Sequence, residues 1–158
     1  MRDGGTCPWY ALIRPRPESA HYYAQRKILF PDIAKLPRFC LDEIGLFPQN
    51  TIYCVVSEER YLLGLLNSSI VTSIVASLSP PVRGGYLRFF RQYVERIPIP
   101  LASPADKQPI EALVQKCLDA KGQGPQVPEW EAEIDKRVAW LYGLKSPPGR
   151  PEPEDDGA

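Results

Sequence analysis

The stretch SPPVRGGYLRFFRQYVERIPIP, residues 79–100, decides how the rest of the chain is arranged. Pro80 and Pro81 end the apolar helix predicted before them, because proline has no backbone N–H and clashes with the preceding turn. Gly84 and Gly85 tolerate backbone angles that side chains disfavour, which is typical of a tight turn. The sequence therefore predicts a helix end, a glycine turn and a new extended segment in direct succession.

The extended segment is predicted as a short strand over residues 86–91, rich in Tyr and Phe, with arginines at 83, 88, 91 and 96 in and around it. Alternation along a strand would place side chains 86, 88 and 90 on one face and side chains 87, 89 and 91 on the other. Arginines beside aromatic rings suit an anionic, stacked polymer. The residues alone leave an alternative open, namely an ordinary hairpin whose arginines are only solvated.

The residues before this stretch predict strands followed by helices. Short apolar runs rich in β-branched and aromatic residues predict strands at 9–13, 27–30, 37–42 and 51–56. Apolar residues at i+4 spacing then predict helix over 58–78, divided by Gly64 and by residues 67–69, with Ser68 or Ser69 as the N-cap. The polar residues inside this run favour a core helix over a membrane span.

Two further helices are predicted after residue 100. The first begins at Ser103 or at Pro109, and the second covers 129–142, carries a Glu133–Arg137 pair and ends at Gly143. Residues 1–8 and 145–158 are predicted to be disordered. The predicted fold class is mixed α/β (α+β), with a curved sheet packed by helices over residues 9–100 and a C-terminal helical pair over 101–144.

Charge is distributed unevenly along a chain whose formal net charge is zero. Residues 1–100 contain 12 Lys and Arg against 8 Asp and Glu, a net +4, whereas residues 101–158 contain 7 against 11, a net −4. The asymmetry indicates a basic working surface in the first part and an acidic second part that faces solvent or a partner. Charge alone does not establish nucleic-acid binding.

The four cysteines and the single histidine argue against a structural zinc site. Cys40, Cys54 and Cys117 lie in apolar patterns and are expected to be reduced core residues, whereas Cys7 precedes the first predicted strand. The first residues lack the apolar segment of a signal peptide, so a cytoplasmic protein is expected.

No catalytic motif is found in the sequence. Nucleotide-binding glycine motifs and the G-x-S-x-G nucleophile motif are absent. His21 lies in a polar, unpatterned stretch, and an isolated histidine of this kind is usually a surface residue. The acidic pairs 42–43 and 58–59 are adjacent in sequence, and adjacent side chains do not face each other. The chain is therefore expected to bind a partner and not to transform it.

The order of motifs resembles the TaqI-like C-terminal specificity domain, the target-recognition part of adenine-N6 DNA methyltransferases and of fused restriction–modification enzymes. The motifs are KILFPDI at 27–33, RF at 38–39, NTIY at 50–53, LLGLLNS at 62–68, RGGY at 83–86, RF at 88–89 and IPIP at 97–100. The ending EIDKRVAWLYGL at 133–144 is similar to the helix that closes many such enzymes. The resemblance covers residues 9–144, and its specificity rests on the order and spacing of the motifs.

The resemblance implies a double-stranded DNA partner and a methyltransferase domain or subunit, with no membrane. In the family a methyltransferase domain precedes this region and holds S-adenosylmethionine, so no cofactor is expected in this chain. The family's Asn-Pro-Pro-Tyr motif is also missing, because Pro80–Pro81 is flanked by Ser79 and Val82. The chain would then be a fragment, a remnant, or a subunit that works beside a separate methylase.

The residues expected to face DNA come from the glycine turn and from the strands before it. Arginine can donate two hydrogen bonds to guanine, and phosphate contacts fix the register of the protein on the duplex. The expected DNA-facing residues are Arg83, Gly84, Gly85, Tyr86, Arg88 and Arg91, and the expected contacts to the DNA backbone are Lys27, Lys35 and Arg38. Two alternatives stay open: an interaction module or decayed remnant that binds no DNA, and a self-sufficient enzyme, for which no catalytic residues are found.

Overall fold

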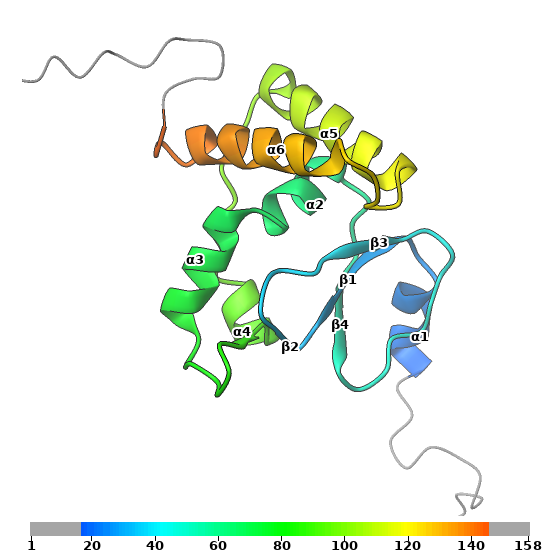
Figure 1. Ribbon diagram of the computed structural model, residues 1–158. Helices are drawn as coiled ribbons and strands as arrows, with labels where there is room; N and C mark the ends of the chain where they lie inside the picture. Colours follow the sequence, from blue (N-terminus) through cyan, green and yellow to red (C-terminus); the bar gives the residue numbers. More distant parts are fainter. Residues whose placement is uncertain (1–16, 146–158) are drawn as a thin grey trace, which may run out of the picture.

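The computed structural model describes residues 17–145, which form six helices and two small antiparallel sheets (Figure 1). The mixed α/β class is confirmed. The strands divide between two sheets and do not form one continuous sheet. The predicted strand at 9–13, Cys7 and the two segments predicted to be disordered lie outside the described residues, except for Lys145.

The larger sheet has the strand order β3-β1-β4, with β1 (Lys27–Pro31) between β3 (Cys40–Asp42) and β4 (Ile52–Val55). The predicted strands at 27–30 and 51–56 are confirmed, and the one at 37–42 is shorter than predicted. Phe30 at the centre lies between the rings of Phe39 and Tyr53, at centroid distances of 4.8 and 5.7 Å. The central strand is therefore buried along most of its length.

The smaller sheet is a two-stranded ribbon of β2 (Ile33–Ala34) and β5 (Leu87–Arg88). The sequence did not predict β2, because two residues are too few for an alternating pattern. It also predicted too long a strand at 86–91, since a short helix, α4 (Arg91–Val94), begins directly after Phe90. The proposed grouping of Arg91 with side chains 87 and 89 on one strand face is therefore wrong.

Helices α2 (Arg60–Leu66) and α3 (Ser69–Leu78) break where the sequence predicted; α2 packs mainly against α5 (Pro104–Asp119), and α3 contacts β5 of the smaller sheet. Ser68 is the N-cap of α3, and its side chain accepts a hydrogen bond from Val71 N at 3.3 Å. Gly64 does not divide the helix as expected. It lies inside α2, where an added Cβ would sit 2.8 Å from Val114 Cγ2, so its role is close helix packing.

No single helix among residues 17–145 is long and apolar enough to cross a membrane. The pair α2 and α3 reaches that length and apolarity together, with a bend of 59° between them.

Helices α5 (Pro104–Asp119) and α6 (Val127–Leu141) form a hairpin that lies across α2 (Figure 1). Helix α5 begins at the first predicted start, because Ser103 and Asp106 form a capping box, and Pro109 lies inside the helix. The Glu133–Arg137 ion pair is present at 2.7 Å. Hydrophobic core residues of the hairpin and of both sheets belong to one cluster, while the boundary at residue 100 stays a prediction.

Helix α1 (Pro17–Tyr23) precedes β1 in a stretch whose structure the sequence did not predict. His21, in its last turn, is exposed, as expected of a surface histidine.

Candidate nucleic-acid interface

The glycine turn is held to the end of α3 by a buried serine. Ser79 is buried, and its hydroxyl accepts a hydrogen bond from Arg88 N at 3.1 Å. Gly84 and Gly85 have φ values of +86° and +76°, a region that side chains rarely adopt. A backbone hydrogen bond from Val82 N to Tyr86 O closes the turn at 3.2 Å. The turn is thus a fixed projection, with Arg83 exposed at its tip.

The ribbon behind the turn has an inward and an outward face. Ala34 and Leu87, which are paired in the ladder, are covered by the core. The neighbouring side chains point outward because alternate residues of a strand face opposite ways. Four side chains therefore form the outward face of the ribbon: Ile33, Lys35, Tyr86 and Arg88.

Both cations of the outward face lie against aromatic rings. Lys35 Nζ is 5.2 Å from the ring centroid of Tyr86, and Arg88 Cζ is 5.4 Å from that of Phe90. A cation over a ring face is attracted by the ring quadrupole, by about 0.5–1 kcal/mol at exposed sites. These two cations are consequently oriented before any ligand arrives.

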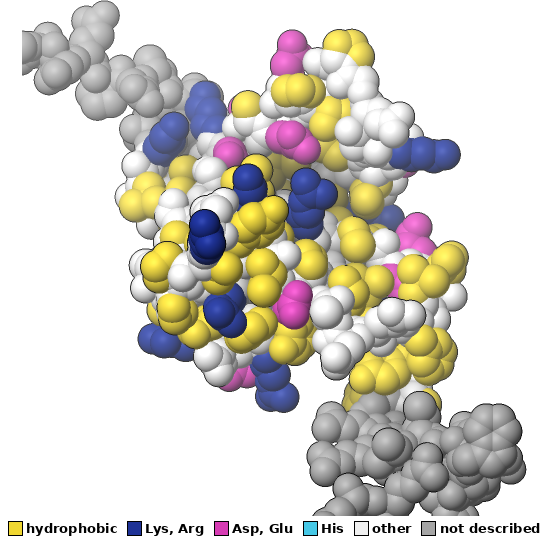
Figure 2. Space-filling model, turned by 60° about the horizontal axis from the view of Figure 1, so that its bottom comes forward, with side chains coloured by type: hydrophobic (Ala, Val, Ile, Leu, Met, Phe, Trp, Pro, Cys, Tyr) yellow, Lys and Arg dark blue, Asp and Glu magenta, His cyan; other side chains and the backbone are white. Residues whose placement is uncertain are grey.

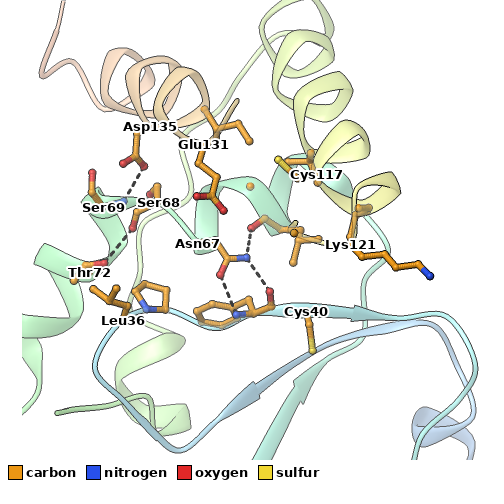
Figure 3. Close-up of a pocket in the computed structure, with 18 residues that line it drawn as sticks. Leu36, Cys40, Asn67, Ser68, Ser69, Thr72, Cys117, Lys121, Glu131 and Asp135 are labelled. Atoms are coloured by element: carbon orange, nitrogen blue, oxygen red, sulfur yellow. Dashed lines mark hydrogen bonds between the residues drawn. The ribbon is translucent and has the colours of Figure 1, made fainter. Parts of the chain in front are cut away.

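The segment that carries Lys35 and Arg38 is anchored by Asn67 at the α2–α3 break (Figure 3). Asn67 Oδ1 accepts from Phe39 N at 3.0 Å, and Asn67 Nδ2 donates to Phe39 O at 2.8 Å and to Leu63 O at 3.1 Å. The asparagine side chain thus pairs with the backbone of the segment as a neighbouring strand would. Lys35 and Arg38 are exposed on this anchored segment.

The expectation that Lys27 contacts DNA is wrong, because its side chain is 0% exposed. Its ammonium group donates to Asp42 Oδ2 and to the carbonyl oxygens of Tyr23 and Gln25. Three backbone N–H groups, at residues 44, 45 and 46, also donate to the Asp42 carboxylate. Lys27 is therefore a structural residue that ties α1, β1 and the loop after β3 together.

Burial by itself would raise the pKa of Asp42. The hydrogen bonds from Lys27 and from the N–H groups of Ile44 and Leu46, with the charge of Lys27, outweigh burial and bring this pKa below its ordinary value.

Arg91 stays at the surface, but in α4 and not in a strand. Its side chain is 84% exposed, and Nε lies 3.1 Å from a carboxylate oxygen of Glu95, four residues later. An exposed pair of this kind contributes about 0–1 kcal/mol, so it does not fix the guanidinium firmly. The structure therefore groups Tyr86, Arg88 and Lys35 on the ribbon with Arg83 on its turn, places Arg38 on the anchored segment after the ribbon, and leaves Arg91 on the next element.

Ile33 is a residue that the sequence reasoning missed. It is 40% exposed and lies directly opposite Arg88 in the ladder. Only its β-branched side chain next to Pro31–Asp32 indicated a strand position, and nothing local specified its partner.

Figure 2 shows the face at the bottom of Figure 1, where Lys and Arg side chains are interspersed with apolar ones.

A pocket of about 550 Å³ lies between the 36–40 segment, the α2–α3 break and the α5–α6 hairpin (Figure 3). Its walls are mainly apolar, and Glu131 and Asp135 of α6 face it. Asp135 accepts a hydrogen bond from Ser69 N at 2.9 Å and so supports the start of α3.

Within residues 17–145, no group of three or more His, Cys, Asp or Glu side chains is arranged to hold a metal.

The cysteines correct one further expectation. Cys40 is exposed, not buried in the core, and Cys54 and Cys117 are only half-buried. Burial raises the pKa of the Cys54 and Cys117 thiols, so both stay protonated near neutral pH.

When the chain is compared with known protein families, one family model matches the part of the sequence that includes this ribbon. The model of the TaqI-like C-terminal specificity domain matches residues 10–99, more than half of the chain. The chain belongs to this family. The TaqI-like domain thus contains both sheets and α1 to α4, and the α5–α6 hairpin follows it.

Curated relatives of this TaqI-like chain are type II methyltransferases. It is 33% identical to M.PaeR7I of Pseudomonas aeruginosa over 144 residues, which cover 86% of this chain and 22% of the relative. It is 34% identical to M.XhoI of Xanthomonas vasicola over 95 residues, 56% of this chain and 17% of the relative. The chain therefore spans about a fifth of the length of these methyltransferases.

A solved structure with a similar fold is that of the type IIL restriction-modification enzyme MmeI in complex with DNA. The TM-score is 0.68 at 17% identity, over 78% of this chain and 19% of the other. At this identity the similarity concerns the fold.

Proposed function

We propose that this chain is the DNA target-recognition part of an adenine-specific type II methyltransferase or restriction–modification system, without the catalytic half. Its partners would be double-stranded DNA and a methyltransferase domain or subunit in the cytoplasm. S-adenosylmethionine would bind that catalytic half. Membership of the TaqI-like family and the partial match to type II methyltransferases support the proposal.

The observation that carries the proposal is a group of unpaired cations on the ribbon, on its glycine turn and on the segment anchored by Asn67. Arg38, Arg83, Arg88 and Lys35 form no ion pair within 4.0 Å among residues 17–145. Arg26 and Lys27 are paired with acids, whereas several cations of α2, α5 and α6 are in no ion pair within the described part of the chain either, so the grouping on and beside the ribbon is what distinguishes these four. Unpaired cations on the ribbon, its turn and the neighbouring segment are available for phosphates, whose neutralisation releases counterions and provides most non-specific affinity.

Salt titration of DNA binding by the purified chain tests the proposal. The logarithm of the association constant is expected to fall linearly with the logarithm of salt concentration, by a slope of about 0.9 for each phosphate engaged. Arg83→Gln and Arg38→Gln should each reduce that slope by about 1 if each side chain engages a phosphate. Arg26→Gln, a matched loss of charge at an exposed arginine that pairs with Glu58, should leave it unchanged.

Two results would contradict the proposal. Absence of measurable affinity for duplex DNA at low salt would favour an interaction module or remnant that binds no DNA. Methyl transfer to DNA by the purified chain alone would show that a catalytic site has been missed.

A further inference from the structure

The outward face of the β2–β5 ribbon carries an apolar side chain as well as cations and an aromatic ring. Phosphate binding does not require the apolar side chain. Ile33 and Arg88 are directly opposite in the ladder, and the next positions on the same face, beyond the inward-facing Ala34–Leu87 pair, are those of Lys35 and Tyr86. Phosphates are recognised by cations, whereas Ile33 offers only an apolar surface, 40% of which is exposed. An exposed isoleucine between two oriented cations therefore indicates a ligand with apolar as well as acceptor groups.

The placement of Arg88 leaves its hydrogen-bond donors available. The guanidinium lies over the Phe90 ring with Cζ 5.4 Å from the centroid. A guanidinium carries its N–H donors in a planar fork that matches two acceptors. Within residues 17–145 no carboxylate occupies that fork, since Arg88 is in no ion pair.

The major groove of DNA presents both kinds of group at the required scale. It admits a two-stranded β-ribbon, and it displays the O6 and N7 acceptors of guanine and the C5 methyl of thymine. Directly opposite residues of an antiparallel pair have Cβ atoms about 4.5–5.5 Å apart. Neighbouring base pairs are separated by about 3.4 Å. Two such side chains therefore reach the same or adjacent base pairs.

We propose that the β2–β5 ribbon enters the major groove, where Arg88 binds the O6/N7 edge of a guanine and Ile33 contacts the methyl group of a neighbouring thymine. Lys35, held over Tyr86, would fix the ribbon against the flanking phosphates. This inference rests on the proposed function, because it specifies which residues of the DNA-binding surface read base sequence.

The test begins with selection of duplexes by the purified chain from a pool with a randomised centre. In the selected duplex each guanine is then replaced by 7-deazaguanine, which lacks the N7 acceptor, and each thymine by uracil, which lacks the methyl group. At one guanine the replacement is expected to weaken binding about tenfold. At a neighbouring thymine the loss should be about fourfold, as for one buried methyl group.

Variants assign each effect to a side chain. In Arg88→Gln the 7-deazaguanine effect should disappear while the uracil effect remains, and in Ile33→Ala the reverse should hold. Arg83→Gln removes the same charge at the turn and should preserve both effects. Ile99→Ala removes a comparably exposed isoleucine, 46% exposed, outside the ribbon and should also preserve both.

Three results would overturn the inference while leaving the proposed function intact. The first is DNA binding without selection of any sequence. The second is that the base replacements weaken binding by both variants as much as binding by the unmodified chain. The third is that inosine, which lacks only the minor-groove amino group of guanine, weakens binding more than 7-deazaguanine does. A chain that binds no duplex at all would instead overturn the proposed function, and the inference with it.

Discussion

Replacement of Lys27 by methionine tests the role that the structure gives to the buried ion pair. The substitution keeps an unbranched side chain of similar length but removes the ammonium group. Asp42 would then lose its only cationic partner among the described residues, and the carbonyl oxygens of Tyr23 and Gln25 would lose a donor. All of these groups surround a side chain that is 0% exposed, so water does not replace the lost donor in the folded state.

The expected loss of unfolding free energy is about 3–5 kcal/mol, because breaking a buried pair leaves an uncompensated charge. The lower end is favoured since three backbone N–H groups still donate to Asp42. A loss of this size is a large part of the roughly 5–15 kcal/mol that stabilises a typical domain. The adjacent residue offers a matched control: Arg26→Met removes a cation from an exposed pair with Glu58, and should lower the free energy of unfolding far less than Lys27→Met.

Urea unfolding followed by circular dichroism at neutral pH measures both losses, and repeating it in acid adds a second readout. Because the pKa of Asp42 is lowered on folding, its contribution is present above its unfolded value, about 3.9, and is lost as pH falls through the folded value. In Lys27→Met burial remains but the hydrogen bond from Lys27 is gone, so the folded pKa rises. Acid unfolding should therefore begin at higher pH than in the unmodified chain.

Equal small losses for Lys27→Met and Arg26→Met would refute this reasoning. They would mean that the Lys27–Asp42 pair is accessible to water. Lys27 would then have been excluded from the candidate DNA contacts incorrectly.

Three further predictions concern packing, capping and a tyrosine. Gly64→Ala should lower the unfolding free energy by about 1–3 kcal/mol in urea titrations, because its Cβ would lie 2.8 Å from Val114 Cγ2. Ser103→Ala should cost about 1 kcal/mol in the same assay, since the capping box of α5 is lost. Burial raises the pKa of Tyr142, whose hydroxyl donates to Pro98 O, to about 12. Stability should therefore fall between pH 10, near the unfolded value, and pH 12, and Tyr142→Phe should lack this fall.

The features predicted correctly from sequence are those that depend on nearby residues. Ser68 was one of the two N-caps predicted for α3, and Ser103 one of the two starts predicted for α5, because a cap is formed within one turn of its own helix. Gly143 was recognised as a helix end for the same reason, and its φ of +72° fits that role. Apolar residues at helical spacing likewise located α5 and α6, whose buried faces they form.

The features that were missed depend on partners distant in the sequence. Lys27 resembles any cation before a strand, and only the folded sheet brings Asp42 of β3 against it. The pairing of Ile33 with Arg88 joins residues more than fifty positions apart, and nothing near Ile33 specifies it. The short helix that removes Arg91 from the predicted strand begins after Phe90, whose aromatic neighbours favoured a longer strand. Neighbouring residues were enough to predict the glycine turn, whereas the set of residues on the outward face of the ribbon depends on pairing between distant segments.

A group of unpaired cations on and beside the ribbon is the reason why one surface of a neutral chain is proposed for DNA. Lys27 and Arg26 are matched with acids near α1, whereas Lys35, Arg83 and Arg88 project from the ribbon and turn without a paired acid among residues 17–145. The net charge of zero therefore conceals a local excess, and local potential, not the total, governs encounter with a polyanion.

Amide chemical-shift mapping of the isotopically labelled chain, titrated with duplex DNA at low salt, tests the central claim most directly. We predict that the largest changes occur at residues 33–38 and 82–88, with little change in α6 or at residues 97–101. Changes centred on α6 or on residues 97–101, or no changes at all, would contradict the assignment of the ribbon and its glycine turn as the DNA-binding surface.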